Sequence, residues 1–139
     1  MTMKTFAAAM AALAIAALTG AARAQGVSVE SLPPSVNKTV PTCGDTEVPA
    51  TTREIKVTFS KDMMTEQMWS WCMHSPDTFP EVTDQNGIRY LPDKRTCVLP
   101  VNLEPEKTYV IWINNQQNNA FKDTKGNSAV PYLLVFKTK

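Results

Sequence analysis

The sequence has almost no net charge and no cluster of charge of one sign. Its 139 residues include 14 Lys and Arg against 13 Asp and Glu, a formal net charge of +1. Nucleic-acid-binding domains present a basic face or stripe, and a block of like charge would indicate a solvated interaction tail. Neither pattern is present, so we predict that the chain does not bind nucleic acid.

Catalytic and redox motifs are also missing. The chain has one histidine, three cysteines and no C-x-x-C, G-x-S-x-G or H-E-x-x-H motif, which argues against a thioredoxin-like site, a zinc ribbon and the common hydrolase centres. Cys72 and His74 would lie roughly 6.6 Å apart on one face of a strand, too far for a hydrogen bond. We therefore predict that the protein is not an enzyme and needs no cofactor.

A long apolar run occurs only at the N-terminus. Lys4 precedes the unbroken run Phe6–Leu18, and the small residues of Ala22-Arg23-Ala24 follow. This is the layout of a secretory signal peptide, and the run is too short for a permanent membrane anchor. We predict a signal peptide over residues 1–24 and a secreted or periplasmic mature protein without a membrane span. Cleavage before Gln25 removes two basic residues and changes the formal net charge from +1 to −1.

Helical periodicity is absent from the rest of the chain, where apolar residues alternate with polar ones. Residues 25–35 are polar, contain proline and predict a flexible lead-in. Asn86-Gly87 predicts a hairpin between two short strands. Short strands separated by turn residues, over roughly 100 residues, indicate one two-sheet antiparallel sandwich over residues 36–139. The expected strands are 36–40, 54–60, 68–73, 78–82, 88–91, 96–103, 108–114 and 132–137.

Five short motifs follow one another along this sandwich. They are Val40-Pro41 with Gly44 and Val48, Val57–Met63, Leu103–Tyr109, Asp123 with Gly126 and Asn127, and Phe136–Thr138. In this order they resemble the bacterial Ig-like domain of SbsA-type surface-layer proteins. The resemblance implies an all-β fold, a single immunoglobulin-like antiparallel β-sandwich of seven to eight strands, with a structural or accessory role. The spacing from Leu103 to Tyr109 also predicts a tyrosine corner, in which the tyrosine bonds back to the preceding turn.

One 12-residue segment, Met63–His74, concentrates soft metal ligands. Thioether, thiolate and imidazole groups together suit Cu(I). The CopC-type periplasmic copper-resistance proteins are similar in having an Ig-like sandwich and methionine-rich copper sites, although their usual N-terminal histidine is absent here. Periplasmic copper binding is therefore one alternative, and methionines that fill gaps in the core are another explanation. The ligands would come from Met63, Met64, Met68, Cys72, Met73 and His74.

The three tryptophans suggest a binding surface. Trp69 and Trp71 lie in one expected strand and Trp112 in another. If Tyr109 points into the core, alternation along the strand turns Trp112 outward. An outward tryptophan beside a second one offers an apolar platform to a sugar ring or a partner protein, and the amide-rich run 114–119 is a loop of the kind that often binds. A core role for Trp69 or Trp71 stays open.

The three cysteines, Cys43, Cys72 and Cys97, fit one disulfide and one free thiol in an oxidising compartment. Cys97 faces the core in its expected strand, so we predict a bridge between Cys97 and either Cys43 or Cys72. Together these features predict a non-catalytic exported Ig-like module that makes binding or structural contacts with a protein or glycan at the cell envelope. Side-chain burial distinguishes these interpretations. Buried methionines would argue against the copper site, and buried tryptophans would argue against the platform.

Overall fold

Alternating apolar residues turn one row of side chains from each long strand toward a shared core. The computed structural model describes residues 26–139, which belong to two units, one ending at Leu32 and the other starting at Pro33. The predicted signal peptide lies outside the described residues. Residues 26–32 of the predicted lead-in contain a short turn in which the Ser31 N–H donates to the Ser28 carbonyl at 3.2 Å.

The second unit is built from short strands and two single 3₁₀ turns, as the all-β prediction required. No helix within residues 26–139 is both long enough and apolar enough to cross a membrane. The elements are β1 (Val36–Val40), β2 (Glu54–Phe59), β3 (Trp71–Met73), η1 (Pro76–Thr78), β4 (Glu81–Val82), η2 (Gln85–Gly87), β5 (Arg89–Tyr90), β6 (Thr96–Asn102), β7 (Thr108–Ile113) and β8 (Tyr132–Lys137).

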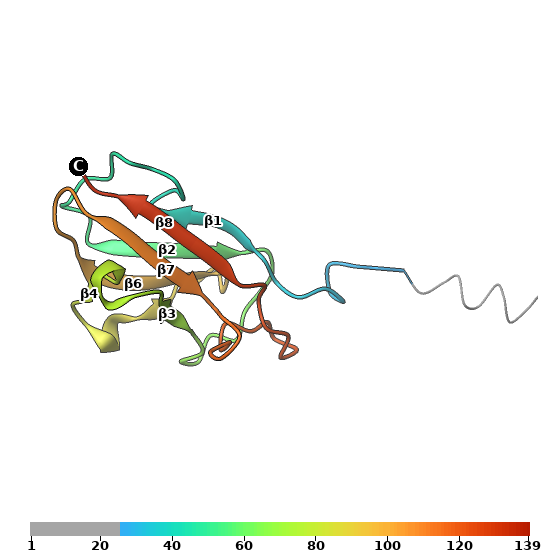
Figure 1. The fold of residues 1–139 in the computed structure, drawn as a ribbon. Coiled ribbons are helices and arrows are strands. Elements are labelled where there is room, and N and C mark those ends of the chain that lie inside the picture. Colours follow the sequence, from blue (N-terminus) through green and yellow to red (C-terminus); the bar gives the residue numbers. More distant parts are fainter. Residues whose placement is uncertain (1–25) are drawn as a thin grey trace, which may run out of the picture. The chain divides into compact units, whose positions relative to one another are not determined.

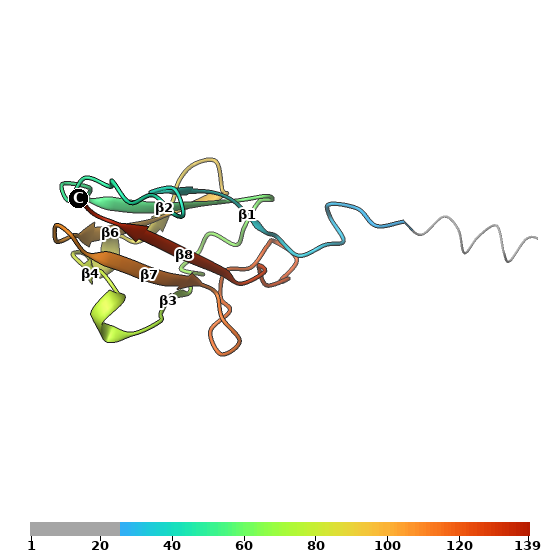
Figure 2. The same ribbon diagram turned by 45° about the horizontal axis from the view of Figure 1, so that its top comes forward.

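The strands form two antiparallel sheets. In the first, β2 pairs with β1 on one edge and with β6 on the other, and β4 and β5 both pair with β6. In the second, β7 lies between β3 and β8. Figures 1 and 2 show the two layers, with β7 and β8 side by side and β2 and β6 in the other layer. The predicted two-sheet sandwich is therefore confirmed.

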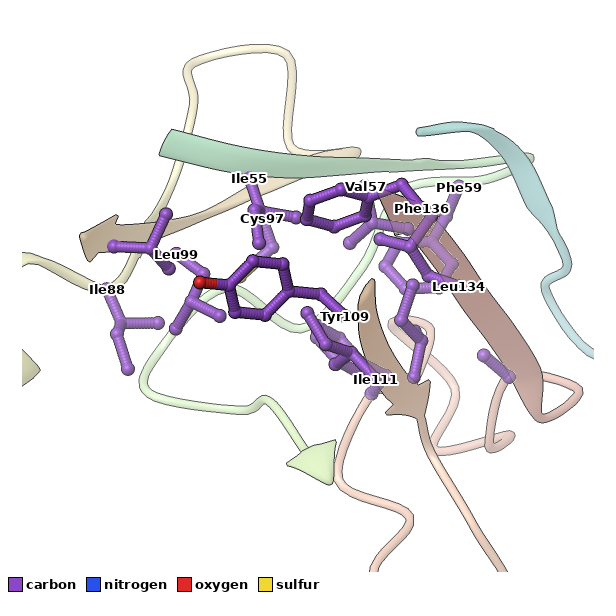
Figure 3. Close-up of a cluster of buried hydrophobic side chains, with 14 of the residues drawn as sticks. Ile55, Val57, Phe59, Ile88, Cys97, Leu99, Tyr109, Ile111, Leu134 and Phe136 are labelled. Carbon is purple, nitrogen blue, oxygen red and sulfur yellow. The ribbon is translucent and has the colours of Figure 1, made fainter. Parts of the chain in front are cut away.

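The core lies between the two layers. Ile55, Val57 and Phe59 alternate inward along β2, and the inward residues of β7 and β8 oppose them (Figure 3). The rings of Tyr109 and Phe136 stack with their centroids 5.4 Å apart. Burying each such large side chain contributes about 1.5–3 kcal/mol, which gives the sandwich the rigidity on which an attached site depends.

A tyrosine corner closes the start of β7, as the sequence predicted. The N–H of Glu104 donates to the Tyr109 hydroxyl at 2.8 Å, and the Tyr109 ring is 1% exposed. The hydroxyl therefore satisfies a main-chain donor of the preceding turn while the ring fills the core.

The segment after β1 changes sheets. The peptide bond between Val40 and Pro41 is cis, and Gly44 has φ +89°, a conformation that glycine adopts without steric cost. The Gly44 N–H donates to the Val135 carbonyl at 2.7 Å, and the Val48 N–H to the Lys137 carbonyl at 3.1 Å. The chain thus covers the outer edge of β8.

The segment between β2 and β6 differs most from the predicted strands. The expected strand 68–73 is reduced to β3, and the expected strand 78–82 is divided into η1 and β4. The hairpin predicted at Asn86-Gly87 is wrong, because β4 and β5 pair with β6 and not with each other. The Asp84 carboxylate accepts from the Asn86 N–H at 3.0 Å and stabilises a 3₁₀ turn in place of the hairpin turn.

Candidate binding groove around Trp69

Trp69 stands just before β3, at the end of the irregular loop that follows β2. It is half-buried, with part of its ring packed against the core. Its indole lies 6.5 Å from the ring of Tyr90, centroid to centroid, at an interplanar angle of 43°. The Tyr90 hydroxyl donates to the Met68 carbonyl at 2.7 Å, and burial raises the pKa of this phenol far above its ordinary range. Tyr90 therefore fixes the backbone next to Trp69 as well as backing its ring.

A hollow of about 960 Å³ opens on one side of Trp69. Its walls come from the loop before Trp69, from η2 and from the turn after β5. Arg89 is held in this wall, because its guanidinium donates to Glu54 Oε2 at 3.0 Å and to the Gly87 carbonyl at 3.1 Å. The lining residues are Thr65, Glu66, Gln67, Trp69, Gln85, Asn86, Ile88, Arg89, Tyr90, Leu91, Pro92 and Lys94.

A second hollow of about 510 Å³ lies on the other side. It shares Trp69, Gln85 and Ile88 with the first, so the two meet along these residues. We call the two hollows together the Trp69 groove. The second hollow is lined by Trp69, Ser70, Trp71, Cys72, Met73, Phe79, Val82, Gln85, Ile88, Leu99, Asn115, Gln117 and Asn118.

The backbone at the rim of the first hollow adopts an uncommon conformation. Gln67 and Lys94 have φ values of +56° and +61°, in the left-handed region that residues with a side chain adopt at a cost. Next to Lys94, the Asp93 carboxylate accepts from the Thr96 N–H and from the Arg95 N–H, both at 2.9 Å. Burial acts to raise the pKa of Asp93, but the hydrogen bonds from Thr96 and Arg95 outweigh it, and the pKa falls below its ordinary value. Left-handed non-glycine residues cluster at functional sites.

The wall formed by the loop after β7 is anchored by a buried asparagine. The Asn114 side chain donates to the carbonyls of Phe121 and Ala129 at 3.0 and 3.1 Å and accepts from the Phe121 N–H at 3.0 Å. Asn115 then closes the loop, with its side-chain oxygen accepting from the Asn118 N–H at 2.7 Å. The amide-rich run singled out in the sequence is thus an ordered wall of the groove.

The model of the bacterial Ig-like domain matches residues 30–138. The chain belongs to this family. A crystal structure of the S-layer protein rSbsC, residues 31–844, is also similar, with 18% sequence identity and a TM-score of 0.49. That similarity covers 79% of this chain and 14% of the S-layer chain. No curated protein matches the sequence.

Membership of this family confirms the resemblance inferred from the five motifs. The sandwich places the three tryptophans of the predicted binding surface on two different faces. Trp71 pairs with Ile113 and packs edge-on against Phe121, with the ring centroids 5.4 Å apart. Trp112 pairs with Cys72 and alternates with buried neighbours, so it faces outward from the β3–β7–β8 sheet. Trp112 therefore points outward, as predicted, but the three tryptophans do not form one platform. Trp69 alone of the three lines both hollows.

The indole N–H of Trp71 is buried and has no hydrogen-bond partner of good geometry. It lies close enough to the Cys97 thiol to act on its ionisation. Burial raises the pKa of Cys97 to about 12, and the contact with Trp71 opposes this only in part. Because a thiol is a weak acceptor, Trp71 is a core residue whose one polar group is poorly satisfied.

The disulfide predicted for Cys97 is not found in the described part of the chain. Cys43, Cys72 and Cys97 are all free thiols in the described part of the chain. Cys97 points into the core, whereas the Cys72 thiol lies on the opposite face of its own sheet and contacts the Asn118 carbonyl at 3.7 Å. Cys43 is exposed beside β8, with its thiol donating to the Leu133 carbonyl at 3.5 Å. The three thiols thus lie in three separate surroundings.

The six soft ligands predicted for copper are also spread over different surroundings. Met63 is 2% exposed in the core, which agrees with a gap-filling role. Cys72 and Met73 point to opposite faces of β3, as neighbours in a strand must. Within residues 26–139 no three His, Cys, Asp or Glu side chains form a group that could hold a metal ion. The remaining ligands are Met64 and His74, which are exposed, and Met68, which is half-buried.

Most lining residues of the groove were not predicted from the sequence. Asn86 was expected in a hairpin turn and Tyr90 in the strand 88–91, and Gln85 was given no role. Asp84 two positions before Asn86 is a capping signal that could have indicated the 3₁₀ turn. Nothing in the sequence marks Tyr90 as the partner of Trp69, because their contact joins residues 21 positions apart.

Proposed function

We propose that this chain is a non-catalytic Ig-like module of the bacterial cell surface, and that it binds an envelope component through the Trp69 groove. The observation that carries this is the groove itself, a half-exposed tryptophan held by a second aromatic ring between two polar walls. Concave sites with aromatic floors and a few fixed polar groups are the usual form of ligand sites.

The predicted signal peptide supports this location. The N-terminal layout is that of a secretory signal peptide, and the chain belongs to a family of bacterial Ig-like domains. A module of this type offers a rigid sandwich and carries its recognition residues on loops and short strands. The Trp69 groove lies in that part of the sandwich.

Cys72, the one cysteine among the lining residues of the groove, supports binding over catalysis. The Cys72 thiol donates to the Ser70 carbonyl at 3.4 Å, and burial raises its pKa. A thiol that is held protonated is a poor nucleophile. The groove therefore offers contact area and hydrogen bonds, with no activated nucleophile at Cys72.

Co-sedimentation with isolated envelopes of the source bacterium tests the proposal. We expect purified residues 25–139 to bind, and Trp69→Ala to weaken binding about tenfold or more, as loss of a central aromatic anchor does. Trp112→Ala is the matched control, since Trp112 faces outward from the β3–β7–β8 sheet and lines neither hollow. Absence of binding by the wild type, or equal losses for the two variants, would contradict the proposal.

A further inference from the structure

We infer that the Trp69 groove binds a glycan chain of mainly uncharged sugars, with one sugar ring stacked on Trp69 and its hydroxyl groups bound by side-chain amides. The assignment rests on the proposed function and names the ligand class of that same site. Three features of the groove point to it, namely the aromatic floor, the side-chain amides of the walls and the small number of charged lining residues.

The floor offers an apolar plane at the meeting point of the two hollows. Trp69 packs against the core with part of its ring and lines both hollows with the rest. A sugar ring has an apolar face of C–H groups with hydroxyls around its edge. Such a ring can cover an indole while its hydroxyls reach the surrounding walls. The Tyr90 contact keeps the indole in place before a ligand arrives, which lowers the entropic cost of binding.

The walls are rich in side-chain amides. Each amide has both donor and acceptor atoms, and each sugar hydroxyl likewise donates and accepts. The first hollow contributes Gln67, Gln85 and Asn86, and the second adds Gln117 and Asn118. Asn115 adds its NH₂ group, because its side-chain oxygen already accepts two N–H groups of the loop. Amides therefore lie on both sides of Trp69, as a ligand that extends past it in both directions requires.

Charge is sparse along the same surface. The first hollow has one acidic and two basic lining residues, Glu66, Arg89 and Lys94, and the second hollow has no Asp, Glu, Lys or Arg in its lining. Arg89 is already engaged by Glu54 at 3.0 Å. A strongly charged ligand would find little complementary charge here, which favours uncharged sugars.

Part of the main chain in the walls is used internally. The Asn115 N–H donates to the Asn118 carbonyl at 2.8 Å and the Gly87 N–H to the Asp84 carbonyl at 3.0 Å. The strands that line the groove with an unpaired edge, β3, β4 and β5, have only two or three residues each. An extended peptide binds chiefly through the main chain of an open strand edge, and such short edges offer few main-chain hydrogen bonds. The observations therefore favour a glycan over a peptide.

Two treatments of the same envelopes test the inference. Sodium periodate cleaves the vicinal diols of sugars, and a protease removes exposed polypeptide. We expect periodate to abolish co-sedimentation of the wild type and protease treatment to leave it. Loss of binding after protease but not after periodate overturns the glycan assignment while the proposed function stands. Failure to bind untreated envelopes overturns the proposed function itself.

Affinity electrophoresis in gels that contain dextran, xylan, β-glucan or glycol chitin identifies the sugar. We expect retardation by at least one of these uncharged or weakly charged polysaccharides. Gln85→Ala tests the walls without disturbing the core, and we expect it to weaken retardation by about three- to tenfold, whereas Trp112→Ala leaves it unchanged. Retardation that is equal in wild type, Trp69→Ala and Gln85→Ala would mean binding outside the groove and would overturn the inference.

Discussion

Two regions of the sandwich are held together in different ways. In β2, β6, β7 and β8, main-chain ladders join strands of six or seven residues. Alternation buries every second side chain of β2 and β7, whereas β6 is buried continuously from Thr96 to Leu99. In residues 63–95, by contrast, strands of two or three residues are joined by turns that side chains cap, such as Asp84 and Asp93. The first region provides a rigid body, and the second, which is free of long ladders, can shape a groove.

This comparison predicts that stability and binding separate along the same boundary. Substitutions in the ladder region should unfold the protein, because they remove core contacts. Substitutions in residues 63–95 should affect binding more than stability. The variants below test whether stability and binding depend on different regions, in order of decreasing effect on the free energy of unfolding.

The largest loss is expected at the centre of the core. Phe59 is 1% exposed and its ring lies 5.0 Å from that of Phe121. Phe59→Ala should lower the free energy of unfolding by about 3–5 kcal/mol, since it combines lost burial with a new cavity. Urea denaturation followed by circular dichroism measures this. A loss below about 1 kcal/mol would mean that Phe59 does not anchor the ladder region.

The next effect comes from a buried ion pair between the segment after β2 and the turn before β8. Lys61 Nζ donates to Asp123 Oδ2 at 2.8 Å, and their side chains are 13% and 1% exposed. The Asn127 amide also donates to Oδ2, at 3.0 Å. Asp123→Asn would place an NH₂ group opposite these two donors and remove the negative charge that Lys61 Nζ contacts. We expect a loss of about 2–3 kcal/mol at neutral pH, toward the lower end of the range for broken buried pairs.

The same pair gives stability a pH dependence. Burial alone would raise the pKa of Asp123, but the hydrogen bonds from Lys61 and Asn127 dominate and lower it to about 2, against about 3.9 in an unfolded chain. The stabilisation is therefore complete above about pH 4 and disappears as the pH falls through 2. Urea midpoints of wild type and Asp123→Asn should converge over this window. A constant difference between them would contradict the role assigned to the carboxylate.

A smaller loss is expected at the tyrosine corner. Tyr109→Phe keeps the ring and removes only the acceptor for the Glu104 N–H. We expect it to lower the free energy of unfolding by about 1–2 kcal/mol, the cost of leaving a partly buried donor unpaired. Glycan or envelope binding should be unchanged, because Tyr109 does not line the Trp69 groove. Altered binding with unchanged stability would contradict the expectation that the ladder region determines stability and not binding.

The ladder region could be predicted from the sequence because its signals are local. Alternation identified β2 and β7 almost to the residue, the β-rich run 132–137 identified β8, and the spacing to Tyr109 identified the corner. The groove could not be predicted in the same way. Its parts meet only through contacts distant in sequence, such as that of Trp69 with Tyr90, and Asn86-Gly87 was misread because the Asp84 cap competes with the hairpin turn. The disulfide prediction was wrong for the same reason. Alternation along the strand correctly places Cys97 in the core, but it does not show whether a second thiol lies nearby.

The smallest effect on stability, and the sharpest test of the comparison, lies at Gly87. A Cβ at this position would come within 2.8 Å of Asp84 Oδ2 and 3.1 Å of Pro100 Cγ. Gly87→Ala should therefore displace the Asp84 cap, shift the wall that carries Gln85 and weaken binding severalfold. Stability should fall by only about 0.5–1 kcal/mol, as for the loss of a cap.

A double-mutant cycle with Asp84→Ala shows whether contact with Asp84 or with Pro100 causes the loss of stability in Gly87→Ala. If the added methyl group acts by displacing the Asp84 carboxylate, that cost disappears once the carboxylate is gone. The double variant should then be no less stable than Asp84→Ala alone, a departure from additivity that residues in contact produce. Additive losses would assign the strain to Pro100 on β6, and the wall of the groove would then depend on the ladder region for its position.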